Sequence, residues 1–147
     1  LTSSLSGGEK RKVALASVLT VGAEILLLDE PLAGLDPQSA HELVRQLKEI
    51  SQAGTTLLIS THQYDELVEM LDHVSVIHKG TDRLHGSNCT FSQVEKLESL
   101  GLQAPLAARA AAALHSRGWP LPPGIATLAD LKDALGGLSE RMADEPV

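Results

Sequence analysis

The apolar run Ile-Leu-Leu-Leu at residues 25–28 is followed at once by Asp29 and Glu30. Four apolar residues without polar alternation are typical of a strand buried on both faces of a parallel sheet. A second such run, residues 55–60, comes after a segment with helical periodicity at residues 38–53. Because strands alternate with helices, the sequence predicts an α/β fold with a mainly parallel sheet and flanking helices.

Other segments complete the expected order of elements. Helices are predicted at residues 9–20, 64–71, 91–100, 107–115 and 127–135, and a hairpin at residues 74–78 and 83–85. Pro37 suits the first position of the helix at 38–53, Gly54 suits its end, and Thr127 is a favourable N-cap. We expect an α/β part at residues 1–86 and a helical C-terminal extension at residues 87–147.

Composition excludes some classes of function. The 147 residues carry a formal net charge of −7, with 12 basic and 19 acidic side chains, so no basic surface for nucleic acid is expected. No apolar run approaches the ~20 residues that cross a bilayer. If the protein works at a membrane, other subunits must hold it there.

A glycine pair near the start of the chain predicts a site for phosphate. The residues involved are Leu5, Ser6, Gly7, Gly8 and Glu9. Glycine lets backbone amides approach a ligand closely, and the helix expected to begin here directs free N–H groups and a positive dipole end at an anion. By itself, the Ser-Gly-Gly sequence is more typical of a turn that caps an ordinary helix than of a phosphate site.

Polar side chains follow both predicted parallel strands. Asp29 and Glu30 end the first strand, and His62, thirty-two residues after Glu30, follows the second. Ligands of open α/β sheets bind at this carboxyl edge. Asp29 is placed to hold Mg²⁺, Glu30 to orient an attacking water, and His62 to hydrogen-bond a terminal phosphate. Taken singly, each residue also fits a solvent-facing strand end or a structural histidine.

In their order and spacing, these motifs resemble the ATPases of the ATP-binding-cassette (ABC) family. Residues 5–9 resemble the signature loop, with Glu9 where many members carry Gln. Residues 25–30 resemble the second nucleotide-site motif, and residues 32–36, ending in Asp36, resemble the loop that crosses the dimer interface. His62 matches the switch histidine. The resemblance covers residues 1–86 and implies the C-terminal half of a P-loop NTPase-like domain that uses ATP and Mg²⁺, with residues 5–9 and Asp36 contacting nucleotide.

The resemblance also implies partners. In this family two ATPase domains enclose two ATP molecules, and the signature loop of one subunit covers the γ-phosphate held by the other. Asp29, Glu30 and His62 would then act on the nucleotide of their own subunit. The expected partners are a second ABC ATPase subunit, identical or related, and integral-membrane transporter subunits. The expected location is peripheral, at the cytoplasmic face of the cell membrane.

One motif of the family is missing from the sequence. The phosphate-binding loop, G-x-x-x-x-G-K-[ST], does not occur, and residue 1 is leucine. We therefore expect a chain truncated at its N-terminus, which by itself neither binds ATP tightly nor hydrolyses it.

Three branches of the family remain open at this point. Pro31 and the Gly34-Leu35-Asp36-Pro37 sequence resemble an importer ATPase. Residues 99–128 resemble the extension of energy-coupling-factor ATPases, closest to those for cobalt and nickel, which implies uptake of a transition metal ion or a vitamin. The alternatives are a soluble ABC ATPase of the ribosome-associated or DNA-maintenance type, and a remnant that only dimerises.

Overall fold

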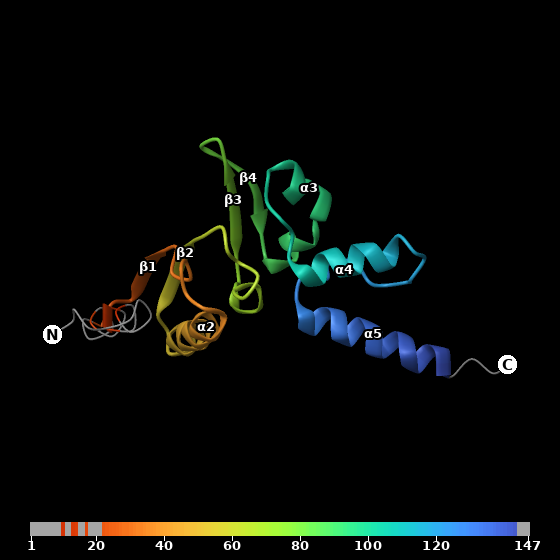
Figure 1. Cartoon of the computed structure of the whole chain (residues 1–147), viewed down its shortest axis with the longest axis horizontal. Helices are drawn as coiled ribbons and strands as arrows, with labels where there is room; N and C mark the ends of the chain where they lie inside the picture. Colours follow the sequence, from red (N-terminus) through yellow and green to blue (C-terminus); the bar gives the residue numbers. More distant parts are fainter. Residues whose placement is uncertain (1–9, 11–12, 15–16, 18–21, 144–147) are drawn as a thin grey trace. The chain divides into compact units, whose positions relative to one another are not determined.

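A computed structural model describes residues 10, 13–14, 17 and 22–143 (Figure 1). The predicted signature loop, residues 5–9, lies outside the described residues, as does most of the helix predicted at 9–20, of which Lys10, Val13, Ala14 and Ser17 are helical. The chain divides into two compact units, residues 1–66 and 67–147, which are described separately. The functional boundary predicted after Gly86 stays a prediction.

The first unit contains the predicted strand–helix–strand arrangement. Strand β1 (Ile25–Asp29) is followed by helix α2 (Pro37–Gln52) and strand β2 (Thr56–Ser60). The two strands pair in parallel with Asp29 opposite Ser60. Both polar strand ends therefore lie at the same edge of the sheet, as the sequence predicts.

Helix α2 begins and ends at the residues expected. Asp36 is its N-cap, and its two carboxylate oxygens accept hydrogen bonds from the Ser39 N–H at 3.0 Å and the Ser39 hydroxyl at 2.6 Å. These two hydrogen bonds, of which the one from the hydroxyl has the larger effect, hold the pKa of Asp36 below its ordinary value. Pro37 takes the first helical position. Gly54 ends the helix at φ +103°, a conformation that glycine adopts without steric cost.

The burial predicted for β1 on both of its faces is wrong. Leu26 is 6% exposed, but Ile25 is 60% and Leu27 69% exposed, and Leu58, opposite Leu27 in the register, is 62% exposed. Successive side chains of a strand point to opposite faces, so these three side chains share one open face. The physical reason is that, among the described helices, α2 packs against this two-stranded sheet and covers one face of it.

The prediction of an α-helix at residues 64–71 is also wrong. The structure has a turn followed by a single 3-10 turn, η2 (Val68–Met70). Eight residues are too few for an α-helix to gain back the cost of its first turn without help from packing. Here the packing favours the tighter turn, in which Leu67 and Val68 are 0% and 1% exposed.

The helix predicted at residues 91–100 is divided in two. A 3-10 segment, η3 (Asn88–Ser92), comes before the short helix α3 (Val94–Ser99), and Gln93 between them has a non-helical ψ of 65°. On one continuous α-helix, residues six apart would point about 120° away from each other. The break allows Phe91 and Leu97 both to be buried, at 3% and 0% exposure.

In the second unit, the predicted hairpin follows η2. Strands β3 (Val74–His78) and β4 (Thr81–Gly86) pair antiparallel (Figure 1). The two connecting residues, Lys79 and Gly80, both have positive φ, +50° and +72°. This is the conformation that two-residue hairpin turns require, because it matches the twist of the strands.

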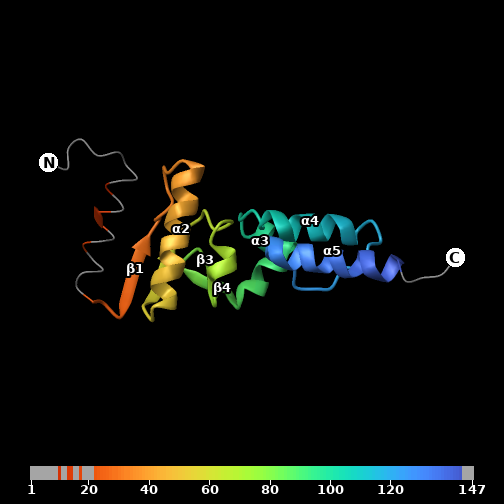
Figure 2. The same cartoon turned by 90° about the horizontal axis from the view of Figure 1, so that it is seen from below.

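Helices α4 (Leu106–His115) and α5 (Leu128–Ala143) lie side by side (Figures 1 and 2). Thr127 caps α5 as predicted, with its hydroxyl accepting from the Asp130 N–H at 3.0 Å. The helix is longer than the predicted 127–135, because its residues beyond Gly136 still pack: Leu138 is 6% exposed. The core between the two helices contains Ala111, Leu121, Ile125 and Leu138. Among the described helices, none is both long and apolar enough to cross a bilayer.

Candidate functional site

The candidate site lies where β1 and β2 end. Asp29 is opposite Ser60 in the parallel register, and the next residues leave the sheet together. The Glu30 N–H donates to the Ser60 carbonyl at 2.7 Å, which ties the two strand ends to each other. Glu30 and His62, separated by thirty-two residues in the chain, are thereby brought into contact, in agreement with the prediction that both belong to one edge.

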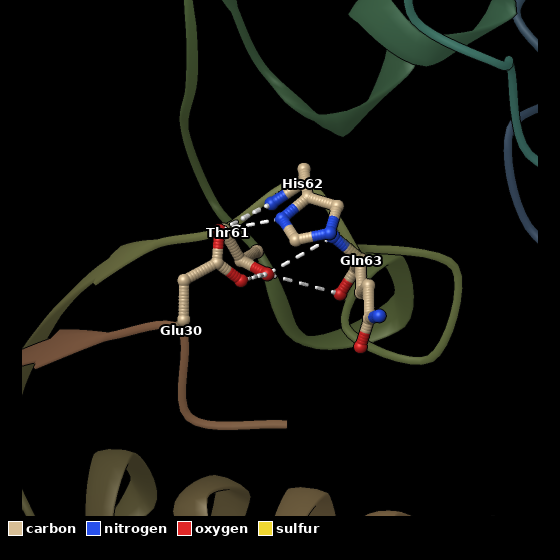
Figure 3. A network of polar contacts seen from close by, with 4 residues as sticks. All are labelled: Glu30, Thr61, His62 and Gln63. Carbon is tan, nitrogen blue, oxygen red and sulfur yellow. Dashed lines mark hydrogen bonds and ion pairs between the residues drawn. The ribbon is translucent and has the colours of Figure 1, made fainter. Parts of the chain in front are cut away.

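The Glu30 carboxylate is the centre of a polar network (Figure 3). Its Oε1 atom accepts from the His62 backbone N–H at 3.2 Å and from His62 Nδ1 at 2.6 Å. Its Oε2 atom accepts from the Thr61 hydroxyl at 2.9 Å. Thr61 Oγ1 in turn accepts from the Gln63 N–H at 3.0 Å. The carboxylate is therefore held at both oxygens and cannot rotate freely.

The backbone of Glu30 is strained. Its φ is +45°, in the left-handed region that residues other than glycine, asparagine and aspartate rarely adopt. Strained residues persist where the surrounding structure over-determines them, and such residues concentrate at functional sites. Here the hydrogen bond to Ser60 and the bonds to His62 hold the residue in place. The strain is independent support for a functional role of this position.

The same hydrogen bonds set the charge of Glu30. The His62 side chain is the main reason that its pKa lies below the ordinary value of 4.5. Partial burial raises the pKa, but the Thr61 hydroxyl and the charge and N–H of His62 lower it further. The carboxylate is consequently ionised at neutral pH, and in that state it only accepts hydrogen bonds.

This charge state fixes the role of one ring nitrogen of His62. Because an ionised carboxylate has no proton to give, Nδ1 must donate, so the ring proton is on Nδ1. The Nε2 atom can then donate to a second acceptor, such as a phosphate oxygen, only when the ring is the doubly protonated imidazolium. The ring is 67% exposed and accessible to a ligand.

Asp29 has the properties of a ligand for a hard cation. It is exposed at the end of β1, and its carboxylate makes no hydrogen bond or ion pair with the described residues. Oxygen donors of this kind suit Mg²⁺, which is commonly bound by one or two carboxylates together with substrate phosphates. Within the described residues, no group of three or more metal-binding side chains forms a complete site. If Asp29 binds Mg²⁺, a bound phosphate compound would have to supply further ligands of the ion.

Two other groups of predicted site residues have different outcomes. Each carboxylate oxygen of Asp36 accepts one hydrogen bond from Ser39 at the start of α2. Its contact with nucleotide stays a prediction. The residues of the predicted signature loop, Leu5, Ser6, Gly7, Gly8 and Glu9, lie outside the described part of the chain, and their role also stays a prediction.

The sequence reasoning missed the part that Thr61 plays. We expected a polar strand end and a histidine, but not a hydroxyl bonded to the acid of the neighbouring strand. The available signal was the parallel pairing: if Asp29 is opposite Ser60, then Glu30 and Thr61 come next on adjacent strands. Residues in that relation are within reach of a hydrogen bond.

Known proteins share both the sequence and the fold of this chain. Residues 2–69 match the family named for the AAA domain and the AbiEii toxin of a type IV TA system. The energy-coupling factor transporter ATP-binding protein EcfA2 of Symbiobacterium thermophilum is 37% identical over 145 residues, which is 97% of this chain and 50% of that protein. The structure of cbiO1 from Clostridium perfringens, part of the ABC transporter complex cbiONQ, superposes with a TM-score of 0.60 at 34% identity, over 76% of this chain and 45% of that one. The fold is that of an ABC ATPase.

A second ABC ATPase structure agrees with this result. The dimeric ATP-binding cassette MJ0796 bound to ADP and Pi has a TM-score of 0.51 at 25% identity, over 57% of this chain and 36% of that one. The predicted α/β, P-loop NTPase-like fold and the resemblance to ABC-transporter ATP-binding subunits, including those of energy-coupling-factor transporters, are confirmed. The chain spans about half the length of the curated relatives it matches.

Proposed function

We propose that this chain is part of an ATP-hydrolysing subunit of an ABC importer of the energy-coupling-factor type. The observation that carries the proposal is the ionised Glu30 at the end of β1, held by His62 at the end of β2. An acid and a histidine at the carboxyl edge of a parallel sheet are suited to act on a bound phosphate ligand. The names of the relatives, an energy-coupling factor ATP-binding protein and part of an ABC transporter complex, support the transport role.

The reaction assigned to this site is hydrolysis of the terminal phosphoanhydride of ATP. A water oxygen attacks the γ-phosphorus, the bond from that phosphorus to the bridging oxygen breaks, and ADP and phosphate leave. Glu30 orients the water by accepting one of its hydrogens, and takes up the proton as the new bond forms. His62 is placed to hydrogen-bond a γ-phosphate oxygen through Nε2. Both acts require only groups that the strand ends already hold.

Asp29 would hold the Mg²⁺ that accompanies the nucleotide. The ion supplies positive charge that offsets the charge of the phosphates. Asp29 suits this task because it is exposed, ionisable and free of other described partners. The signature-loop residues 5–9 and Asp36 belong to the proposal as nucleotide-contacting residues.

The proposed partners are a second ABC ATPase subunit and integral-membrane transporter subunits. The dimeric state of a related cassette supports the first, and the cbiONQ complex of another relative supports the second. The subunit would act at the cytoplasmic face of the membrane without spanning it. Uptake of a transition metal ion or a vitamin is the cargo that the energy-coupling-factor type implies.

A second candidate is a soluble ABC ATPase that is not coupled to transport. The family match at residues 2–69, which is named for a toxin system, favours it. That match leaves out residues 70–147, whereas the match to the energy-coupling factor protein extends over 97% of the chain. The greater coverage supports the transport subunit. Co-purification with membrane subunits distinguishes the two candidates, because a soluble ATPase would be recovered without them.

The proposal is tested by Glu30→Gln in the full-length subunit that contains this chain. Glutamine has nearly the same shape but cannot take up a proton, so kcat for ATP should fall by about a hundredfold or more while KM changes little. Glu24→Gln is the matched control, because it makes the same chemical change at the opposite end of β1. Undiminished turnover in the Glu30 variant would remove this residue from the catalytic role.

A further inference from the structure

The Thr61 hydroxyl has one proton and two nearby hydrogen-bond acceptors, of which one is strongly favoured. Its Oγ1 lies 2.9 Å from Glu30 Oε2 and 3.4 Å from the Gln63 carbonyl. The closer acceptor is also a charged one, and hydrogen bonds to ionised acceptors are roughly twice as strong as neutral ones. The hydroxyl therefore donates to Glu30.

The Gln63 backbone keeps the hydroxyl in this orientation. The Gln63 N–H donates to Thr61 Oγ1 at 3.0 Å and so occupies one of its lone pairs. With an N–H fixed on one side, rotation of the hydroxyl away from Glu30 would exchange a short charged contact for a long neutral one. The chain from Gln63 through Thr61 to Glu30 is visible in Figure 3.

Counting acceptor positions then shows which carboxylate oxygen is open. A carboxylate offers about two acceptor positions on each oxygen. Both positions on Oε1 are taken by the N–H and the Nδ1 of His62. On Oε2, Thr61 takes one, and within the described residues no second donor is present. The remaining position on Oε2 is the one from which Glu30 can accept a hydrogen from water.

We propose that Thr61 is a positioning residue of this site, whose hydroxyl fixes the Glu30 oxygen that receives the attacking water. The inference rests on the hydrolysis proposed above and adds to it the residue that aims the acid. In this role Thr61 would act without touching the water or the phosphate itself. Its effect passes entirely through Oε2 of Glu30, because that is the atom to which it donates.

The test compares variants at Thr61 in the full-length subunit. Thr61→Val has nearly the same shape without the hydroxyl, and kcat should fall by about tenfold, since a hydrogen bond to a charged group is lost. KM for ATP should stay unchanged, because Thr61 does not contact the nucleotide. Thr61→Ser should restore kcat, and Thr61→Cys, with its weak S–H donor, should give an intermediate value. The graded series also tests the idea if the valine variant fails to fold.

Two controls distinguish a positioning role from a general effect on folding. Thr56→Val makes the same chemical change on an exposed residue at the opposite end of β2 and should leave kcat unaltered. In a Glu30→Gln background, Thr61→Val should lower the residual kcat no further, because the residue through which it acts has already been changed. A kcat that does not follow the donor strength of residue 61, or a further loss in the double variant, would overturn the inference.

The outcomes also separate the two proposals from each other. If Glu30→Gln abolishes turnover but Thr61→Val retains the original kcat, only the role of Thr61 is rejected. If Glu30→Gln retains full turnover, the proposed function of the site is rejected, and the inference on Thr61 falls with it.

Discussion

Gly86, the last residue of strand β4, leaves no room for a methyl group. A β-carbon added there would lie 2.7 Å from the hydroxyl oxygen of Thr90, and real β-carbons essentially never come closer than 3.0 Å to another atom. Thr90 is 5% exposed, so it has little space into which to withdraw. In addition, Gly86 has a φ of +155°, which residues with a β-carbon seldom adopt.

These two effects set the size of the expected loss in Gly86→Ala. Forcing an extra carbon into a packed site costs about 1–3 kcal/mol. An unfavourable positive φ adds roughly 1 kcal/mol. The free energy of unfolding should therefore fall by about 2–4 kcal/mol, a large part of the stability of a small domain.

Urea denaturation of the 147-residue chain, followed by circular dichroism, measures this loss. Gly101→Ala is the matched control, since Gly101 has a φ of +79° and no atom within 4 Å of the added carbon. It should lose only the backbone contribution, about 1 kcal/mol. In the Thr90→Ala background, Gly86→Ala should cost clearly less, because the opposing oxygen is gone. Equal losses at Gly86 and Gly101, or an undiminished loss in the double variant, would refute the steric argument.

Two further predictions concern the stability of each unit. Leu47 of α2 is 0% exposed, so Leu47→Ala should lower the free energy of unfolding by about 3 kcal/mol. Leu58 is 62% exposed, so Leu58→Ala should change the free energy of unfolding by less than about 0.5 kcal/mol. Urea denaturation of both variants measures this difference. Burial raises the pKa of Asp130, but the N–H and hydroxyl of Thr127 and the Ala126 N–H outweigh it and leave the pKa below its ordinary value of 3.8. The stabilisation that Asp130 gives α5 as a cap is then complete above the unfolded-state pKa of Asp130 and is lost as the pH falls through its folded-state pKa. The difference in free energy of unfolding between the original chain and Asp130→Ala should therefore narrow on acidification. A constant or widening difference would contradict the capping role.

Much of the fold could be predicted because local chemistry determined it. The short apolar runs gave both parallel strands, and Pro37 and Gly54 gave the ends of α2. The hairpin and the cap at Thr127 followed from turn and capping preferences in the same way. Each of these features depends on residues close together in the sequence, where propensity and structure agree.

The errors arose where packing decided the outcome. Periodicity could not distinguish a strand with one open face from a strand buried on both, because Ile25 and Leu27 are as apolar as Leu26. Nor could it reveal that burying Phe91 and Leu97 together requires a break at Gln93. Both outcomes depend on which other elements are present to cover a surface.

The candidate site was predictable in its members but not in its bonding. Parallel pairing of the strands implied that Glu30 and His62 meet at one edge, and they do. Glu30 makes this contact with its backbone in the left-handed region, at a φ of +45°. A glutamate in that conformation is rare enough that no sequence pattern would indicate it.

The open face of the β1–β2 sheet has a practical consequence for work in solution. Ile25, Leu27 and Leu58 present apolar surface to water, and among the described residues the two-stranded sheet has two outer edges that no further strand pairs with. Two copies of the chain that bring these surfaces together exclude water from both, so association and folding are linked through protein concentration. Unfolding midpoints of different variants are therefore comparable only when they are measured at one fixed concentration.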